Sequence, residues 1–325
     1  MLSLALRDNL PWDQDLVWTY LYQQLESDMP ITIDICPEAC CLRSAGVYDL
    51  LDKFCVTVGY NKTITIKTAN MIEYHSIYKI ERNAGSWYEL PLLQQWLKDN
   101  PIIYTTTPSK MFGCFNSRNH WSRLWLSTIL YNYYKEKSLL TYHYDGTVIN
   151  FNYDLYIGID DLIKRDCEQI TQAYNFLQNC PLTLDQINEY PIQHPANMSL
   201  LKFYQDLFVD IVSETNVAGN SFLVTEKTWR SIISKRPFIV MSNQGFLHHL
   251  KKLGFKTFDF YWSEEYDQNS DKNRIKHIID LLDQLSKLTL VQVEEMLKDM
   301  DDILEHNLSV FNSLSFGRLN EIFNG

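Results

Sequence analysis

The stretch from residue 211 to residue 240 constrains the fold of this chain more than any other. An apolar run ends at Ser213, a polar loop with one glycine follows, and residues 222–229 carry a signal for the start of a helix. The helix ends before Pro237, and a second apolar run begins directly after it. This order predicts a strand, a loop, a helix and a strand, the repeating unit of a parallel α/β sheet. Open α/β sheets bind ligands at the carboxyl ends of their strands, and helix N-termini attract phosphate.

Polar side chains gather where this helix begins. Glu214 follows the first strand, and Thr225, Glu226 and Lys227 stand at the start of the helix. Carboxylates accept hydroxyl protons, and an ammonium group binds phosphate. The four residues therefore suit a ligand that has both hydroxyl and phosphate groups. Taken alone, Lys227 also fits a surface ion pair with Glu226 or Asp210, and Glu226 also fits an acid placed by the helix dipole.

These residues resemble the donor-binding motif of nucleotide-sugar glycosyltransferases of the α1,3-fucosyltransferase type. In that family a strand ends in a Glu-containing turn, and an aromatic-x-Thr-Glu-Lys signature precedes a helix. Glu214 matches the first acid, and residues 225–227 match the signature. Leu223 fills the aromatic position, and Phe222 lies one position early. The resemblance implies that Glu214 and residues 225–227 contact the donor.

A second resemblance to this family lies upstream. Residues 110–119 form a lysine-led apolar strand that ends in an Asn-Ser pair, and Ser122 and Arg123 follow. In the family, an arginine after this strand and the lysine of the signature hold the diphosphate of the donor. The alignment gives these roles to Arg123 and Lys227, with Arg118 as a competing arginine. Together the two motifs support sugar transfer better than they support fucose.

Two residues of the loop are further candidates for the donor site. Asn216 lies between the strand and the helix and is a candidate donor contact. Phe222 either packs on the donor base or staples the start of the helix. The loop has the single glycine Gly219, so it carries no glycine-rich motif that would cradle a phosphate.

The pattern of apolar runs along the rest of the chain predicts two α/β domains, as expected for a chain of 325 residues. Alternating apolar runs predict strands at residues 31–36, 55–59 and 63–67 of the first domain and at 110–115, 139–144, 207–212, 238–241 and 257–260 of the second. We expect an N-terminal acceptor-side domain at 1–105, a C-terminal nucleotide-sugar-binding domain at 106–271 and C-terminal helices at 272–325. Two Rossmann-like domains that face a cleft form the architecture called GT-B.

The helical pattern at the end of the chain allows two arrangements. In two-domain sugar transferases a C-terminal helix commonly crosses back to the first domain. Residues 272–323 fit that arrangement, and they fit a plain helical cap on the second domain equally well.

Transfer of a sugar to a hydroxyl group needs a base that takes the hydroxyl proton. The base should come from the first domain, across the cleft. Glu38 is the first candidate, because it lies in a turn after the predicted strand 31–36. Glu73 is the second, because it follows the strand 63–67 and a short turn. Asp34 alternates within a strand and can point either way, and each of these acids also fits a structural or solvated role.

Charge and cysteine content narrow the partners and the compartment. The formal net charge of −11 disfavours nucleic acid as the main partner, whereas a nucleotide sugar needs only one or two fixed cations. The expected partners are a nucleotide sugar and a glycan or a small hydroxyl acceptor. The seven cysteines, an odd number without a secretory leader, predict a cytoplasmic protein. The sequence contains no run of about 18 apolar residues, so it predicts no membrane span.

No cofactor or metal ion is expected. The cysteines near residue 40 lack paired C-x-x-C spacing and a histidine partner, and Asp160-Asp161 does not match a D-x-D metal motif. Without a metal, the charge that develops on a departing diphosphate must be stabilised by cations or helix amides. We expect Arg123, Lys227 and the amides near Thr225 to do this.

The sequence therefore predicts an inverting, metal-independent glycosyltransferase. Two alternatives stay open. One is sugar transfer to modified DNA bases, which a basic groove lined with aromatic residues on the first domain would favour. The other is a non-catalytic module that binds a nucleotide or a glycan on the same scaffold. The sequence does not identify the base, the sugar or the acceptor.

Overall fold

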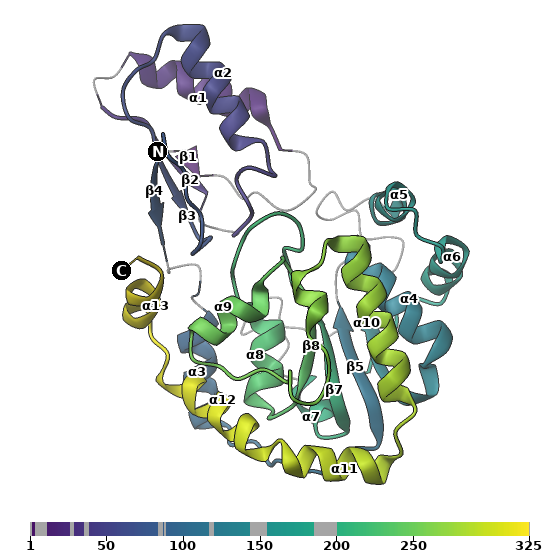
Figure 1. The fold of residues 1–325 in the computed structure, drawn as a ribbon. Helices are drawn as coiled ribbons and strands as arrows, with labels where there is room; N and C mark the ends of the chain where they lie inside the picture. Colours follow the sequence, from purple (N-terminus) through teal and green to yellow (C-terminus); the bar gives the residue numbers. More distant parts are fainter. Residues whose placement is uncertain are drawn as a thin grey trace.

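The structure is a computed structural model that describes residues 2–3, 12–26, 29–35, 39–83, 87, 89–116, 120–143, 155–184 and 200–324. This part of the chain forms two α/β domains, each built around a four-stranded parallel sheet, and ends in a series of helices (Figure 1). The predicted fold class, two α/β domains of the GT-B-like type with a helical C-terminus, is confirmed.

The first sheet follows the order of the chain. Ile33 and Ile35 of the second strand and Ile66 of the third are fully buried and form the first hydrophobic core together with two helices. In Figure 1 these helices lie side by side on one side of the sheet. The elements are β1 (Leu2–Ser3), α1 (Gln14–Leu25), β2 (Thr32–Ile35), α2 (Val47–Val58), β3 (Thr65–Thr68) and β4 (Lys79–Arg82), with the sheet order β1-β2-β3-β4.

The strand predicted at residues 55–59 is wrong, because α2 continues through this segment to Val58. Leu51 and Phe54 repeat at helical spacing and are fully buried, while Val56 is 84% exposed. Packing of one helical face on the core therefore overrides the preference of the β-branched residues for a strand. Gly59, at φ +66°, ends the helix in the left-handed conformation that glycine adopts most easily.

The second sheet has the order β6-β5-β7-β8, and all its strands are parallel. The central strand β7 is buried along its whole length. The elements of this domain are α3 (Glu89–Asp99), β5 (Lys110–Asn116), α4 (Trp121–Tyr133), η2 (Lys135–Lys137), β6 (Ser138–Tyr142), α5 (Leu155–Lys164), α6 (Ile170–Gln178), α7 (Leu201–Tyr204), β7 (Leu207–Ser213), α8 (Glu226–Ile233), β8 (Phe238–Met241) and α9 (Phe246–Lys252).

The strand predicted at residues 257–260 is also wrong, because this segment forms turns. The amide of Phe258 donates to Glu264 Oε1 at 2.7 Å, and the hydroxyl of Thr257 donates to Glu264 Oε2 at 2.7 Å. One buried carboxylate thus takes the backbone donor that a neighbouring strand would otherwise take.

The C-terminal helices run along the second domain and return to the first. The elements are η5 (Glu265–Gln268), α10 (Asp271–Ser286), α11 (Leu290–Asp299), α12 (Asp301–Ser313) and α13 (Phe316–Asn324). Figure 1 shows α11 and α12 along the lower side of the second domain and α13 beside β4. Arg82 of β4 donates from Nη1 to the carbonyl of Phe323. The tail therefore crosses back to the first domain.

Helix α3 packs on the second core although it precedes residue 105. Leu90 and Leu93 are buried in that core, and Gln94 donates to the carbonyls of Phe311 and Leu314 at 2.6 and 2.9 Å. The boundary at residue 105 stays a prediction, and this packing favours a boundary before α3.

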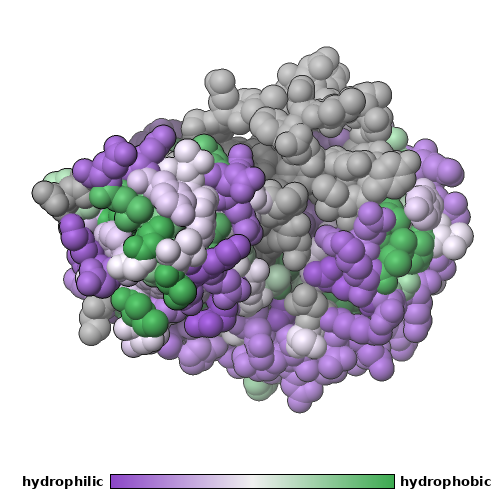
Figure 2. All heavy atoms as spheres, turned by 90° about the horizontal axis from the view of Figure 1, so that it is seen from above, coloured by the Kyte–Doolittle hydropathy of each residue, from purple (hydrophilic) through white to green (hydrophobic). Residues whose placement is uncertain are grey.

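The outer surface mixes apolar and polar side chains. Figure 2 looks down on α1 and α2, where apolar side chains lie between hydrophilic ones. Leu16, Tyr22 and Val56 are exposed on these helices, as is common on ordinary protein surfaces. Within the described ranges, no helix is long and apolar enough to cross a membrane.

The loop between β7 and α8 is tied to the first domain. Asn70, in the turn after β3, donates from Nδ2 to the carbonyl of Asn220 at 2.9 Å and accepts from the amide of Phe222 at 3.0 Å. One side-chain amide thus satisfies a backbone acceptor and a backbone donor of the other domain. The first domain therefore helps to fix the loop that leads into α8.

Gly219 lies in close contact with the first domain. Its φ is +73°, and a Cβ at this position would lie 2.3 Å from Ser44 Oγ and 2.6 Å from Cys41 Cβ. Gly46 has the same φ, but a Cβ there would have no atom within 4 Å. Comparing Gly219 with Gly46 therefore separates the effect of backbone strain from the effect of the contact between the domains.

We predict that Gly219→Ala lowers the free energy of unfolding by about 1–3 kcal/mol more than Gly46→Ala, because only Gly219 combines positive φ with overpacking. Denaturant unfolding of the two variants, followed by tryptophan fluorescence, measures the difference. Equal losses would show that the domains separate enough to accommodate the methyl group.

Candidate functional site

The candidate site lies where the second sheet reverses its direction of winding. The chain passes from β5 to β6 on one side and then to β7 on the other side of β5, so the connections leave β5 and β7 in opposite directions. Open α/β sheets bind ligands at the carboxyl ends of such strands. Ser122 Oγ, in the first turn of α4, lies 3.0 Å from Ser213 Oγ at the end of β7. This contact brings the segments after β5 and β7 to the same edge.

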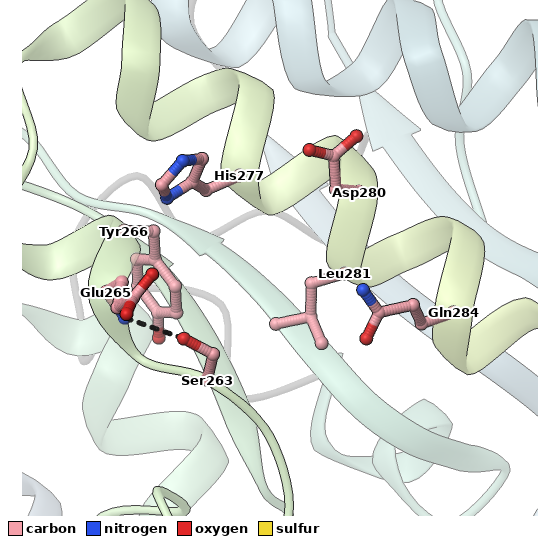
Figure 3. A pocket seen from close by; sticks show the side chains of 7 residues that line it. All are labelled: Ser263, Glu265, Tyr266, His277, Asp280, Leu281 and Gln284. Carbon is pink, nitrogen blue, oxygen red and sulfur yellow. Dashed lines mark hydrogen bonds between the residues drawn. The ribbon is translucent and has the colours of Figure 1, made fainter.

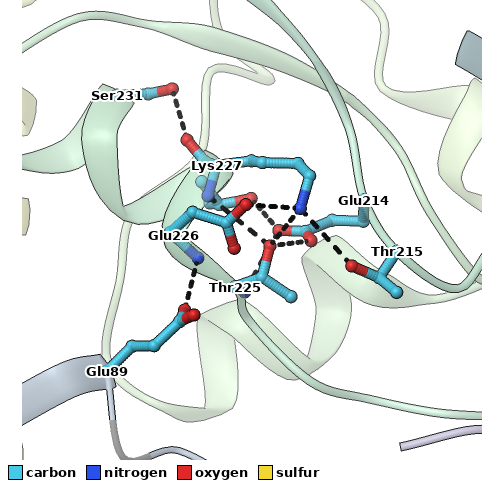
Figure 4. A network of polar contacts seen from close by, with 8 residues as sticks. Glu89, Glu214, Thr215, Thr225, Glu226, Lys227 and Ser231 are labelled. Atoms are coloured by element: carbon cyan, nitrogen blue, oxygen red, sulfur yellow. Dashed lines mark hydrogen bonds and ion pairs between the residues drawn. The ribbon is translucent and has the colours of Figure 1, made fainter. Parts of the chain in front are cut away.

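Glu214 fastens the start of α8 to the end of β7. Its side chain is 1% exposed and accepts from the amide of Thr225 at 3.3 Å, the hydroxyl of Thr225 at 2.5 Å and the hydroxyl of Thr228 at 2.6 Å (Figure 4). A buried carboxylate is stable only when donors replace its water. The structure thus gives Glu214 an anchoring role, and its predicted contact with a donor stays a prediction.

Lys227 lies in the first turn of α8 among oxygen atoms. Its Nζ is 2.7 Å from Glu226 Oε1, 3.2 Å from Thr225 Oγ1 and 3.4 Å from Thr215 Oγ1 (Figure 4). Its side chain remains 12% exposed. The ammonium group is therefore held by three oxygen contacts that a competing anion can exchange, rather than sealed in the core.

The first amides of α8 already have acceptors. The amide of Thr225 donates to Glu214, that of Glu226 donates to Glu89 Oε2 at 2.9 Å, and that of Lys227 donates to Thr225 Oγ1 at 3.5 Å. In this conformation the protein itself takes the donors that were expected to face a phosphate. The side-chain cations are then the groups left for that task.

Arg123 and Lys227 act on one carboxylate. Burial by itself would raise the pKa of Glu226, but Lys227, Arg230 and Arg123 outweigh it and hold this pKa well below its usual range. Arg123 is buried in the first turn of α4. The two predicted cations, which come from separate segments of the chain, thus both stabilise the charged form of Glu226.

Glu89 forms a pair with Glu226 across the two helices. Burial raises the pKa of Glu89 to about 8, and the Glu226 carboxylate raises it too, whereas Lys227 acts in the opposite direction. Two adjacent carboxyl groups disfavour double ionisation. Because Glu226 keeps its charge beside Lys227, the proton of the pair resides on Glu89.

A second layer of charge lies beneath α8. Asp210 of β7 accepts from the hydroxyls of Tyr204 and Ser231, each at 2.7 Å, and burial raises its pKa to about 6. Arg230 is fully buried nearby, and the charges of Glu226 and Asp210 help to keep it protonated against the cost of burial.

The charges of this cluster balance when Glu89 holds a proton. The cations are Arg123, Lys227 and Arg230, and the acids are Glu89, Asp210, Glu214 and Glu226. A protonated Glu89 leaves three carboxylates for three cations. Ionisation of Glu89 would add an uncompensated charge in a region of low dielectric, which agrees with its raised pKa.

The remaining predicted donor residues lie in different surroundings. Phe222 is fully buried, with its ring 5.7 Å from Trp87 and 5.4 Å from Phe246. This packing favours the staple alternative over stacking on a donor base. Asn216 is buried after β7, and its Oδ1 has no hydrogen-bond partner in the described part of the chain. Arg118 lies outside the described residues.

The structure describes one of the two acids that were predicted as the general base. Glu38 lies outside the described residues. Glu73 is buried and accepts from the amide of Leu42 at 3.1 Å, the hydroxyl of Tyr48 at 2.8 Å and Asn70 Nδ2 at 2.9 Å. It braces the residue that ties the two domains together. A role for either acid as the base stays a prediction.

A small pocket lies away from this cluster, between η5 and α10 (Figure 3). Its volume is about 210 Å³, below the usual range for ligand pockets of roughly 300–1,000 Å³. None of its lining residues was predicted as a donor contact. They are Ser263, Glu265, Tyr266, His277, Asp280, Leu281 and Gln284.

Among the described residues, no group of three or more His, Cys, Asp or Glu side chains is arranged to hold a metal ion. A reaction without a metal stays a prediction that rests on the cations of the site.

Sequence reasoning missed Glu89 and Arg230. Glu89 opens a helix, where an acid is ordinary because of the helix dipole. Its contact with α8 spans 137 positions in the sequence, and no local pattern reveals such a contact. Arg230 follows Glu226 by four positions, a spacing that indicates a pair on one helical face. That spacing was the available signal, although it does not distinguish a buried arginine from an exposed one.

Comparison with known proteins gives a remote structural similarity. No family model matches the chain, and no curated protein matches it. Among solved structures, the chain is similar to an α,α-trehalose-phosphate synthase (UDP-forming) from Burkholderia vietnamiensis, with 12% sequence identity and a TM-score of 0.36. The match covers 94% of this chain and 70% of that chain. At this level a function has to follow from the geometry of the site.

We predict that the free energy of unfolding falls as pH rises from about 4 to about 7, in part because of Asp210. Its folded pKa of about 6 lies above the unfolded value, so its contribution is complete below pH 4 and is lost as pH rises through 6. Asp210→Asn should reduce this fall by up to about 3 kcal/mol. Denaturant unfolding at several pH values measures it.

The exposed Asp302 supplies the matched control, since Asp302→Asn removes a carboxylate without touching the cluster. The same pH dependence in Asp210→Asn and in the unsubstituted protein would contradict the assignment to Asp210.

Proposed function

We propose that this protein is a glycosyltransferase that moves a sugar from a nucleotide-sugar donor to a hydroxyl acceptor, in an inverting reaction that needs no metal ion. The observation that carries the proposal is the position of Lys227 at the start of α8, where its Nζ contacts Glu226 and two threonine hydroxyls. Arg123 lies buried in the first turn of α4, next to the Ser122 that contacts the end of β7. The two cations come from connections that leave β5 and β7 in opposite directions, at the edge where open α/β sheets bind ligands.

The cations suit the main electrostatic demand of the reaction. As the bond between sugar and diphosphate breaks, the diphosphate gains negative charge, and fixed cations stabilise it. Lys227 exchanges its contacts with Glu226 and two threonine hydroxyls for the phosphate oxygens. Arg123 contributes a second positive charge from the first turn of α4. Two cations supply the charge that a divalent metal supplies in other sugar transferases.

The other donor contacts follow from the loop after β7. Asn216 Oδ1 is an acceptor without a partner among the described residues, and it suits a hydroxyl group of the donor ribose or sugar. Glu214 acts through α8, because its three acceptor bonds hold the turn that carries Lys227. Phe222 acts as a staple that keeps this turn on the core.

We predict that Lys227→Met weakens the binding of a nucleoside diphosphate about 10- to 100-fold, because a charge-assisted phosphate contact contributes about 1.5–3 kcal/mol. Arg123→Met should weaken it by a similar factor. Arg123→Lys, which keeps the charge in the buried position, should retain most of the affinity. Calorimetric titration with UDP, GDP and TDP measures the affinities.

Lys287→Met is the matched control, since Lys287, directly after α10, is exposed and forms an ion pair with the exposed Asp283. A thermal-shift screen of the unsubstituted protein with UDP-glucose, UDP-galactose, GDP-fucose and GDP-mannose should find at least one stabilising donor. If no nucleotide stabilises the protein, or if Lys227→Met and Lys287→Met bind equally, the proposal fails. Binding without any turnover would instead indicate a non-catalytic binding module.

A further inference from the structure

The proposed transfer leaves open which group takes the proton of the acceptor hydroxyl. A base must be fixed in orientation, must keep a free lone pair, and must reach solvent or substrate with that lone pair. Glu73 and Glu214 do not meet the third condition, because both are buried. Each also accepts three hydrogen bonds from the protein, which hold it in a structural role.

Glu226 is a poor base for a different reason. Its Oε1 lies 2.7 Å from Lys227 Nζ, and the surrounding cations stabilise its charged form. A carboxylate stabilised in this way binds a proton weakly. Glu226 therefore holds the lysine in place.

Glu89 meets all three conditions. Its Oε2 is fixed by the amide of Glu226, and its Oε1 accepts no hydrogen bond within the described part of the chain. Glu89 is half-buried, so its carboxyl group is less enclosed than those of the buried Glu73 and Glu214. Figure 4 shows the carboxyl group of Glu89 pointing at the first turn of α8, where Glu226 and Lys227 lie.

The position of Glu89 in the chain also fits this role. It is the first residue of α3, the helix that follows β4 and leads from the first sheet to the second. A side chain there contacts the start of α8, which carries Lys227, without belonging to α8 or to α4, which carries Arg123. The base can then contact the acceptor hydroxyl while the cations contact the diphosphate of the donor.

We propose that Glu89 is the general base of the sugar transfer, with Oε1 as the atom that takes the acceptor proton. This inference rests on the proposed function. The acceptor oxygen forms a bond to the anomeric carbon of the sugar as its proton passes to Oε1. The bond between that carbon and the diphosphate oxygen breaks, and its electron pair leaves with the diphosphate, which Arg123 and Lys227 stabilise.

The electrostatics of the cluster support this role. The charged groups that face Glu89 are Glu226 and Lys227 of α8 and Glu214 after β7, and burial is the largest cause of its raised pKa of about 8. A carboxyl group with this pKa is a much stronger base than an exposed one, and it ionises near neutral pH. Because only the ionised form accepts a proton, the rate should rise as pH rises through about 8.

The test uses Glu89→Gln, in which the amide oxygen can still accept from Glu226 and keep α8 capped. The probe is donor hydrolysis, with water as the acceptor and UDP or GDP release as the readout, using whichever nucleotide sugar stabilises the protein. We expect kcat to fall about 10²- to 10⁴-fold, with nucleoside diphosphate affinity within about threefold of the unsubstituted protein. The rise of kcat/KM through about pH 8 should disappear.

Three further variants complete the test. Glu89→Asp keeps a carboxylate and should retain more activity than Glu89→Gln, together with the alkaline rise. Glu295→Gln removes an exposed carboxylate of α11 and should leave the rate unchanged. Glu73→Gln tests the competing candidate, and a large loss of kcat there without a loss in Glu89→Gln would return the role to Glu73.

The outcomes separate the two proposals. If Glu89→Gln binds the nucleotide and turns over within about threefold of the unsubstituted protein, Glu89 is not the base, and the proposed function stands. If Glu89→Gln does not fold, the pH profile of the unsubstituted protein decides, because a flat kcat/KM between pH 6.5 and 9.5 overturns the inference. If the unsubstituted protein binds no nucleotide sugar, both proposals fall.

Discussion

The carboxylate of Glu214 connects the end of β7 to the start of α8, and the geometry of the cluster depends on that connection. Three donors from Thr225 and Thr228 surround it, which offsets the cost of burying its charge. The same contacts fix the direction of the first turn of α8. Lys227 and Glu226 are carried by that turn, so their positions relative to β7 follow from the bonds of the buried Glu214.

Electrostatic balance explains why so many charged residues share one small region. Burial raises the pKa of Glu89 and of Asp210, yet three cations and four acids share this region. Each cation stabilises neighbouring carboxylates, and the excess acid keeps a proton. An arriving diphosphate then meets cations that already exist in charged form, so binding needs an exchange of partners at Lys227 rather than the creation of new charge.

The sequence predicts the parallel sheet and the edge that carries the cluster, because residues 211–240 have local signals for every element. Thr225 is a visible cap, and Glu214 directly follows an apolar run. Local sequence signals give the wrong structure, or none, where packing between distant segments determines it. Residues 55–59 favour a strand by composition, but the buried face of α2 makes them helical. Glu89 enters the cluster through a contact between distant segments, which no periodicity encodes.

The loop between β7 and α8 is hydrogen-bonded to both domains, through one asparagine of each. Asn70 of the first domain holds Asn220 and Phe222, while Asn243, after β8, donates to the carbonyl of Ala218 at 2.6 Å. Asn243 Oδ1 also accepts from Ser221 at 2.9 Å. A movement of the first domain relative to the second must either break the bonds of Asn70 or carry the loop along. Since that loop ends in the turn that bears Lys227, the relative position of the domains and the placement of the cation are mechanically linked.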